Sequence, residues 1–108
     1  MTDSRTRLCG MLGLAMRAGK VTIGTEQVCL AMSRKGRGKP DLVLVSVGAS
    51  EATKKKVTVK AEFYGIEAVE IDIGIEELGK LLGKTYAPAT VAIVDMGFAD
   101  AIRKVMTN

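Results

Sequence analysis

Histidine and tryptophan are absent from the sequence, and its 108 residues include only two cysteines, two prolines, two tyrosines and two phenylalanines. Without histidine the chain lacks the commonest metal ligand and the commonest general base, and it cannot form a Ser-His-Asp or Cys-His catalytic arrangement. Cys9 and Cys29 form no Cys-x-x-Cys motif, and both lie among apolar residues. We expect them to be small buried hydrophobes in a reducing compartment. No catalytic residue, metal site, cofactor or small-molecule substrate is therefore expected.

Long hydrophobic runs are also missing. No apolar stretch approaches the ~20 residues needed to span a bilayer, and the first residues show no signal-peptide pattern. We therefore expect a cytoplasmic protein that does not enter a membrane. A length of 108 residues with 47% hydrophobic residues fits one domain over residues 1–108, with a core built mainly from aliphatic side chains because aromatic ones are few.

Charge is unevenly distributed along the chain. Residues 1–60 hold twelve Lys and Arg against four Asp and Glu, a net charge of +8, whereas residues 61–108 hold four against eight, a net charge of −4. A basic half in a small domain indicates a polyanionic partner, most often a nucleic acid. The basic run 34–39 is long enough to reach a phosphate backbone; the alternative is a solvated turn.

Helical and strand patterns alternate along the chain, which predicts a three-layer α/β/α domain. The clearest strand is the continuous apolar run 41–47, which is expected in the middle of a sheet with both faces buried. Residues 51–64 contain a strand-like alternation, but their length and lysine-rich start favour a helix. Ser4, Ser50 and Asp95 are the expected N-caps. The predicted helices are 4–18, 24–36, 51–64, 75–82 and 96–107, and the predicted strands are 20–23, 41–47, 66–71 and 90–94.

The stretch 19–38 contains the strongest candidate for a binding site. A glycine precedes its predicted helix, and the free backbone N–H groups and partial positive charge of such a helix start suit phosphates and base edges. An ordinary surface helix with a glycine before it is the alternative. Its buried face is marked by Val28, Ala31 and Met32, and its outward stripe combines a carboxylate, an apolar and two guanidinium groups, from Glu26, Leu30, Arg34 and Arg37.

A second glycine-rich stretch is similar to a phosphate-binding loop but lacks its geometry. Residues 79–85 read Gly-Lys-Leu-Leu-Gly-Lys-Thr, with three residues between the glycines, whereas a phosphate-binding loop needs four and should follow a strand and open a helix. This stretch closes a predicted helix instead. We therefore expect its glycines to allow a close turn and not to bind a nucleoside triphosphate.

Five segments carry a recognisable pattern, namely residues 12–28, 42–45, 49–56, 78–84 and 90–99. In their order and spacing they resemble the L-seven-Ae ribosomal protein family, most closely its bacterial branch. The resemblance implies an α/β/α sandwich around a four-stranded mixed sheet. It also implies a non-enzymatic protein of the ribosome or its assembly that binds the kink-turn, a sharply bent RNA helix with tandem sheared G·A pairs, with ribosomal RNA and ribosomal proteins as expected partners.

The same resemblance implies the residues that contact RNA. The family places the start of its second helix in the major groove at the kink, through a Gly-x-Asn-Glu-x-x-Lys-type motif, and packs the loop before its last strand on a base near the kink. Gly24 matches the motif glycine, Lys20 a basic residue before the helix, and 85–88 the loop. With Arg34 of the basic run, the expected RNA-binding residues are Lys20, Gly24, Thr25, Glu26, Gln27, Leu30, Arg34, Thr85, Tyr86, Ala87 and Pro88.

Three positions depart from the family motif. Glu26 stands where asparagine is usual and, when ionised, only accepts hydrogen bonds; Gln27 stands where glutamate is usual and both donates and accepts. Leu30 replaces a lysine, which removes a cation and should flatten the salt dependence of RNA binding by about one unit of slope. The leading hypothesis is recognition of kink-turn or similar bent RNA. The alternative is a protein-interaction module on the same fold, with weak or lost RNA binding.

Overall fold

Helices and strands alternate along the computed structural model, which describes residues 3–107. The predicted order of elements is confirmed, with most boundaries displaced by one or two residues. The helices are α1 (Ser4–Arg17), α2 (Thr25–Met32), α3 (Glu51–Phe63), α4 (Ile75–Leu81) and α5 (Met96–Met106), and the strands are β1 (Val21–Ile23), β2 (Leu42–Ser46), β3 (Ala68–Ile71) and β4 (Thr90–Ile93).

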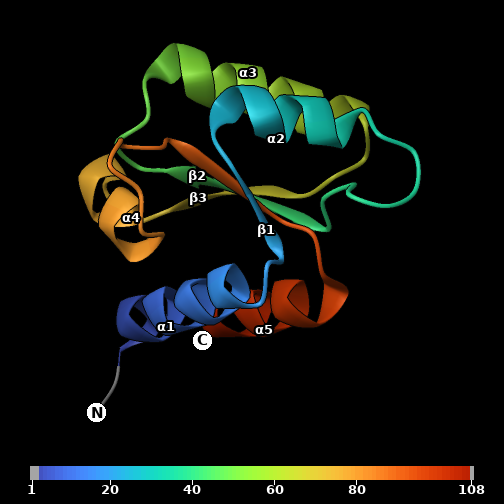
Figure 1. Cartoon of the computed structure of the whole chain (residues 1–108). Coiled ribbons are helices and arrows are strands. Elements are labelled where there is room, and N and C mark those ends of the chain that lie inside the picture. Colours follow the sequence, from blue (N-terminus) through green and yellow to red (C-terminus); the bar gives the residue numbers. More distant parts are fainter. Residues whose placement is uncertain (1–2, 108) are drawn as a thin grey trace.

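The four strands form one mixed sheet in the order β1-β4-β2-β3. β4 runs antiparallel to both β1 and β2, whereas β3 runs parallel to β2. Figure 1 shows α2 and α3 over one face of this sheet, α1 and α5 over the other, and α4 beside one end of the strands. The predicted three-layer α/β/α architecture around a four-stranded mixed sheet is therefore confirmed.

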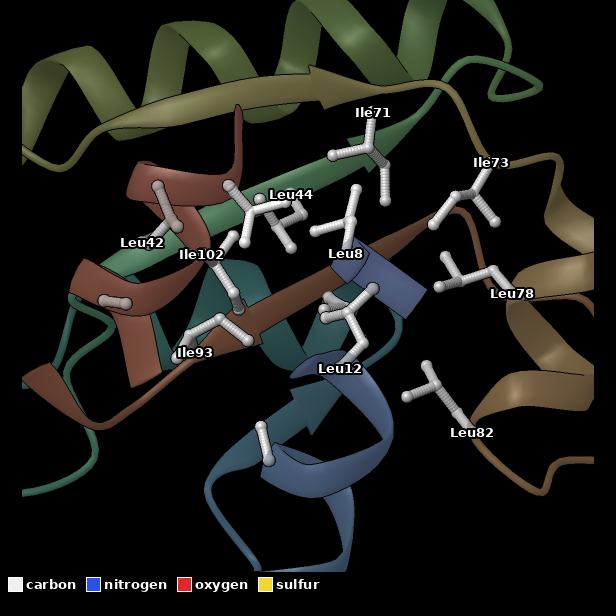
Figure 2. Close-up of a cluster of buried hydrophobic side chains, with 14 residues drawn as sticks. Leu8, Leu12, Leu42, Leu44, Ile71, Ile73, Leu78, Leu82, Ile93 and Ile102 are labelled. Carbon is white, nitrogen blue, oxygen red and sulfur yellow. The ribbon is translucent and has the colours of Figure 1, made fainter. Parts of the chain in front are cut away.

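The two faces of β2 contribute to two separate cores. All five of its residues are buried, as its apolar run predicts. Leu42 and Leu44 pack toward α1 and α5, whereas Val43 and Val45 pack toward α2 and α3, because successive side chains of a strand point to opposite faces. The larger core, shown in Figure 2, also contains Leu12, whose complete burial stabilises the fold by about 1.5–3 kcal/mol.

One predicted N-cap and one predicted helix end are wrong. Asp3, and not Ser4, is the N-cap of α1: its Oδ1 accepts a hydrogen bond from the Thr6 N–H at 2.8 Å, which lowers the pKa of the Asp3 carboxyl. The helix predicted over 24–36 ends at Met32, where the Ser33 and Arg34 N–H groups donate to carbonyls three residues back instead of four. The φ angles of Gly36 and Gly38, 88° and 87°, keep the following segment outside helical geometry. The predicted N-caps of α3 and α5 are confirmed: Ser50 accepts from Thr53 N–H, and Asp95 accepts from Phe98 N–H.

The cysteine thiols are both free. Cys29 is buried in the α2–α3 core, as expected, whereas Cys9 is only partly buried at the edge of the other core. Burial raises the pKa of the Cys9 thiol, so Cys9 is a poor nucleophile near neutral pH. Within residues 3–107, no cluster of three potential metal-ligating side chains occurs. Over the same range, each helix is too short or too polar to cross a lipid bilayer.

Candidate nucleic-acid interface

The start of α2 is shaped by Gly24. This residue has a φ of 101° and a ψ of 140°, a conformation that residues with a side chain rarely adopt. Its N–H donates to the Thr90 carbonyl at 2.9 Å, and its carbonyl accepts the first helical hydrogen bond, from Val28 N–H. Within the described chain, no side chain caps this helix start. The first N–H groups of α2 therefore remain available to a ligand, at the positive end of the helix dipole.

A pair of threonines fixes this helix start to the sheet. The Thr25 hydroxyl lies 3.0 Å from the Thr90 hydroxyl, and Thr90 is completely buried at the beginning of β4. The antiparallel register pairs Ile23, at the end of β1, with Val91. The end of β1 and the start of β4 thus lie at one end of the sheet, where Figure 1 also shows the start of α2.

The loop that precedes β4 reaches the same end of the sheet. Gly83 turns the chain after α4 with a φ of 69°, and the Lys84 N–H donates to the Gly79 carbonyl at 2.8 Å. Gly79 lets the loop pack closely on α4, since a Cβ atom there would lie 2.5 Å from the Tyr86 carbonyl oxygen. The predicted close turn is confirmed, and these glycines close α4 without opening a phosphate-binding loop.

This loop presents an exposed aromatic ring beside a shallow pocket. Tyr86 is 53% exposed, and an aromatic face of this kind can stack on a nucleobase. Lysines at the rim add positive charge, and Glu76 contributes a single carboxylate. The pocket measures about 370 Å³ and is lined by Glu76, Lys80, Lys84, Thr85, Tyr86 and Ala87.

Glu26 forms an ion pair with a neighbouring helix. Its Oε1 accepts a hydrogen bond from the Lys56 Nζ of α3 at 2.7 Å. This hydrogen bond lowers the pKa of the Glu26 carboxyl and raises the pKa of the Lys56 ammonium. Glu26 is therefore ionised near neutral pH, and its charge is balanced by a cation that lies 30 residues away in sequence.

The lysine run 54–56 forms ion pairs with neighbouring elements. In addition to the Lys56 pair, Lys54 bridges Glu70 at 3.1 Å and Glu51 at 3.7 Å. The hydrogen bond to Glu70 is the main cause of a raised pKa for Lys54. Two of these three lysines thus connect α3 to its neighbours, α2 on one side and β3 on the other.

The outward stripe of α2 is only partly as predicted. Leu30 is 58% exposed, and Glu26 and Gln27 are also exposed. Arg34 lies beyond the end of the helix, with its guanidinium against Gly38 of the following turn. Eight helical residues span about 12 Å, so Arg34 is separated from the helix start.

Lys20 is also separated from the start of α2. It precedes β1, and its carbonyl accepts from Val94 N–H, at the end of the sheet opposite Gly24. Four extended residues span about 13 Å. The structure thus brings together the start of α2 and the loop before β4, and it leaves Lys20 and Arg34 at the periphery.

Three residues that organise this region are absent from the predicted set. Thr90 anchors the helix start, Gly79 positions the loop, and Lys56 pairs with Glu26. The sequence carries a weak signal for Gly79, a glycine inside a predicted helix, because such a glycine often marks a close backbone approach. Thr90 and Lys56 require the register of the sheet and the packing of two helices, which local spacing does not reveal.

Comparison with known proteins places this geometry in a family. Residues 6–103 match the "Ribosomal protein L7Ae/L30e/S12e/Gadd45 family". The chain is 36% identical over 104 residues to an RNA-binding protein YlxQ of Enterococcus faecium, covering 95% of this chain and 94% of that protein. It is 39% identical over 92 residues to the RNA-binding protein YlxQ of Bacillus subtilis, covering 85% and 87% of the two chains.

A solved structure has a similar fold. A protein of unknown function from Bacillus halodurans superposes with a TM-score of 0.84 at 29% identity, covering 94% of this chain and 98% of that one. The family match covers most of the chain and includes both the start of α2 and the loop before β4. The protein therefore belongs to the L7Ae family of ribosomal and related proteins, as its sequence motifs predict.

Proposed function

We propose that this protein binds RNA, that its target is a kink-turn or a similarly bent helix, and that it acts in the cytoplasm on ribosomal RNA or during ribosome assembly. The observation that carries the proposal is the convergence of two elements at one end of the sheet. The Gly24 N–H and the Thr25 hydroxyl are both bound to Thr90, which follows the loop that carries Tyr86. Family membership and the RNA-binding names of two relatives support the same function.

The chemistry of the helix start suits an RNA groove. Uncapped N–H groups at the start of α2 can donate to phosphate oxygens. Gln27 can donate to and accept from a base edge, and Glu26 can accept from guanine N–H groups. The exposed ring of Tyr86 can stack on an unpaired base. Such a site reads mainly the shape of a bent RNA, with a few base contacts to fix its register.

A binding function without catalysis fits the residues of this region. The polar groups at the start of α2 itself are backbone N–H groups, a hydroxyl, an amide and a paired carboxylate. None of them forms the nucleophile–base arrangement that hydrolysis or group transfer requires. Recognition is therefore the role that this set of residues supports.

A protein-interaction role is the second candidate. It is favoured by large apolar side chains on the outer surface of α2 and α3: Leu30 and Val59 are each 58% exposed, and Phe63 is 80% exposed. Leu30 also lies one turn from Glu26 and carries no charge that could attract a phosphate. A protein that had lost RNA affinity could use this surface instead.

The decisive experiment is a titration of a fluorescently labelled kink-turn RNA at two salt concentrations. Its control is the same RNA with the sheared G·A pairs replaced by Watson–Crick pairs. Tight, salt-sensitive binding that is lost in the control would support recognition of the kink. Equal, weak binding to both RNAs would contradict the proposal and favour the protein-interaction role.

The assignment of residues is tested separately with single substitutions. Gln27→Ala should weaken binding to the kink-turn by about five- to tenfold, the scale of one lost base contact. Lys104→Ala is a control at a distant position, because Lys104 lies on α5, across the sheet from α2. If Gln27→Ala binds as tightly as the parent protein, the site does not include the start of α2.

A further inference from the structure

The start of α2 poses an electrostatic difficulty for a nucleic-acid interface. Glu26 is a carboxylate in the first turn of this helix, where phosphates would approach. An unpaired negative charge at that position would repel the RNA backbone. No residue of α2 balances the charge of Glu26, because the helix contains no lysine or arginine and the next residue on the same stripe is Leu30.

The adjacent helix supplies the missing cation. The Lys56 ammonium donates to the Glu26 carboxylate at 2.7 Å, and Lys60, one turn further along α3, also acts on Glu26 by its charge. The local charge at the helix start is thus neutral or positive despite the glutamate.

The ion pair has a geometric consequence as well. A carboxylate that accepts a hydrogen bond on one oxygen keeps its second oxygen free and holds a limited range of orientations. Lys56 therefore presents Glu26 as an oriented acceptor. Such an acceptor fits the amino and imino N–H groups of guanine, the donors that an acidic side chain recognises on a base edge.

We propose that Lys56 is a positioning residue of the RNA interface, which cancels the charge of Glu26 and orients its carboxylate toward base N–H donors. The inference rests on the RNA-binding function proposed above. In this arrangement α3 provides the cation of the interface, in place of a lysine at the position of Leu30. The RNA-contacting surface then extends from the start of α2 onto the adjoining side of α3.

The pair is not needed to hold the two helices together. The side chains of Glu26 and Lys56 are 79% and 51% exposed, and exposed ion pairs contribute little to stability. The helices are instead fixed to the sheet by buried Val28, Met32 and Val57. Variants at Glu26 and Lys56 are therefore expected to fold like the parent protein.

A double-mutant cycle tests the proposal with the kink-turn RNA and its Watson–Crick control. Lys56→Ala should weaken binding to the kink-turn by about five- to tenfold, the scale of one charge interaction at an exposed site. Combining it with Glu26→Gln should restore most of that loss, because the neutral amide no longer repels phosphate. Lys104→Ala, which removes the same charge from α5, should change binding by less than about twofold.

The cycle separates positioning from a direct contact. If Lys56 itself contacted a phosphate, its removal would lower the salt slope by about one and would cost the same affinity with Glu26 or Gln at position 26. Additive effects of the two substitutions would therefore overturn the proposal. Lys56→Gln, which keeps most of the side chain, should behave like Lys56→Ala and guards against an effect of lost packing.

The outcomes also distinguish this inference from the function on which it rests. A parent protein that binds both RNAs equally would overturn the proposed function and the role of Lys56 together. A parent protein that prefers the kink-turn, with an additive cycle, would overturn the role of Lys56 alone. Preference for the kink-turn with a strongly non-additive cycle would support both.

Discussion

The hydroxyl of Thr25, the first residue of α2, lies 3.0 Å from the hydroxyl of Thr90, the first residue of β4, across 65 positions of sequence. This contact joins the helix start to the strand that follows the loop around Tyr86. Because Thr90 is completely buried, its position is set by the core. The geometry of the candidate interface is therefore determined by the sheet and does not depend on the loop alone.

Replacing Thr90 by valine should destabilise the protein and weaken RNA binding. Valine has nearly the same shape but leaves the Thr25 hydroxyl without its partner, so a loss of about 0.5–1.5 kcal/mol in the free energy of unfolding is expected. Urea denaturation measures this loss. Thr58→Val on the outer surface of α3 is the control and should change stability little, since Thr58 is exposed. A Thr90→Val protein with unchanged stability and affinity would show that the threonine pair does not anchor the helix.

Gly24→Ala should be destabilising for a conformational reason. No atom lies within 4 Å of a Cβ built at Gly24, but its φ of 101° is unfavourable for alanine. The expected cost is about 1–3 kcal/mol, measured by thermal or urea unfolding. Gly10→Ala provides a matched control: Gly10 lies inside α1, also with open space around its Cβ. There alanine should stabilise the helix by about 0.5–1 kcal/mol, so equal effects at the two glycines would contradict this explanation.

The fold was largely predictable from the sequence because its signals are strong and local. The apolar run of β2 identified a doubly buried strand, and the caps Ser50 and Asp95 marked two helix starts. The end of α2 was not predictable. Its apolar periodicity continues no further than Met32, but the polar residues that follow suit a helix or a turn equally. The cap of α1 was displaced by one residue because Asp3 and Ser4 are both good N-caps.

The candidate site was predictable only in part. A glycine before a polar helix start identified the region around Gly24, and the family motif identified Glu26 and Gln27. The partners of these residues come from distant segments, namely Thr90 from β4 and Lys56 from α3. Contacts between distant segments depend on sheet register and helix packing, so a single sequence carries no direct signal for them.

Gly79→Ala should displace the loop before β4. A Cβ atom at this position would lie 2.5 Å from the Tyr86 carbonyl oxygen and 3.2 Å from Pro88 Cδ. Relief of this overlap requires a shift of the backbone, which typically costs about 1–3 kcal/mol. Urea unfolding and amide chemical shifts of the loop would report the change. Gly13→Ala, in the open surroundings of α1, should leave the loop shifts unchanged. If Gly79→Ala also leaves the loop chemical shifts unchanged, the close packing of Gly79 does not position the loop.

Tyr86→Ala should weaken RNA binding with little effect on stability. The ring is 53% exposed, so its removal costs little core packing, whereas stacking on a base contributes about 1–3 kcal/mol. A titration with kink-turn RNA measures the loss. Tyr86→Phe keeps the ring and should bind like the parent protein. A Phe variant that is as weak as the Ala variant would mean that the hydroxyl, and not the stacking surface, makes the contact.

Removing Lys56 should raise the pKa of Glu26. The Lys56 hydrogen bond is the main cause that holds this pKa below its ordinary value of 4.5, so in Lys56→Ala the midpoint should move up toward 4.5. A ¹³C NMR titration of the Glu26 carboxyl carbon measures the shift. Lys104→Ala is the control and should leave the midpoint in place. An unchanged midpoint in Lys56→Ala would mean that the ion pair is not populated in solution.

The two shifts also define the pH range in which the pair exists. Folding lowers the pKa of Glu26. The contribution of its carboxylate to folding stability is therefore complete above pH 4.5 and is lost as the pH falls through the lowered folded-state pKa. Folding raises the pKa of Lys56, so the contribution of its ammonium is complete below pH 10.5 and is lost as the pH rises through the raised folded-state pKa. The Glu26–Lys56 ion pair should therefore persist from pH 5 to pH 8. Other carboxylates, with ordinary pKa values of about 4, are also ionised over this range.

Kink-turn affinity at constant ionic strength should be independent of pH between pH 5 and pH 8. A steep change between pH 5 and pH 8 would place a different titrating group, on the RNA or the protein, at the interface.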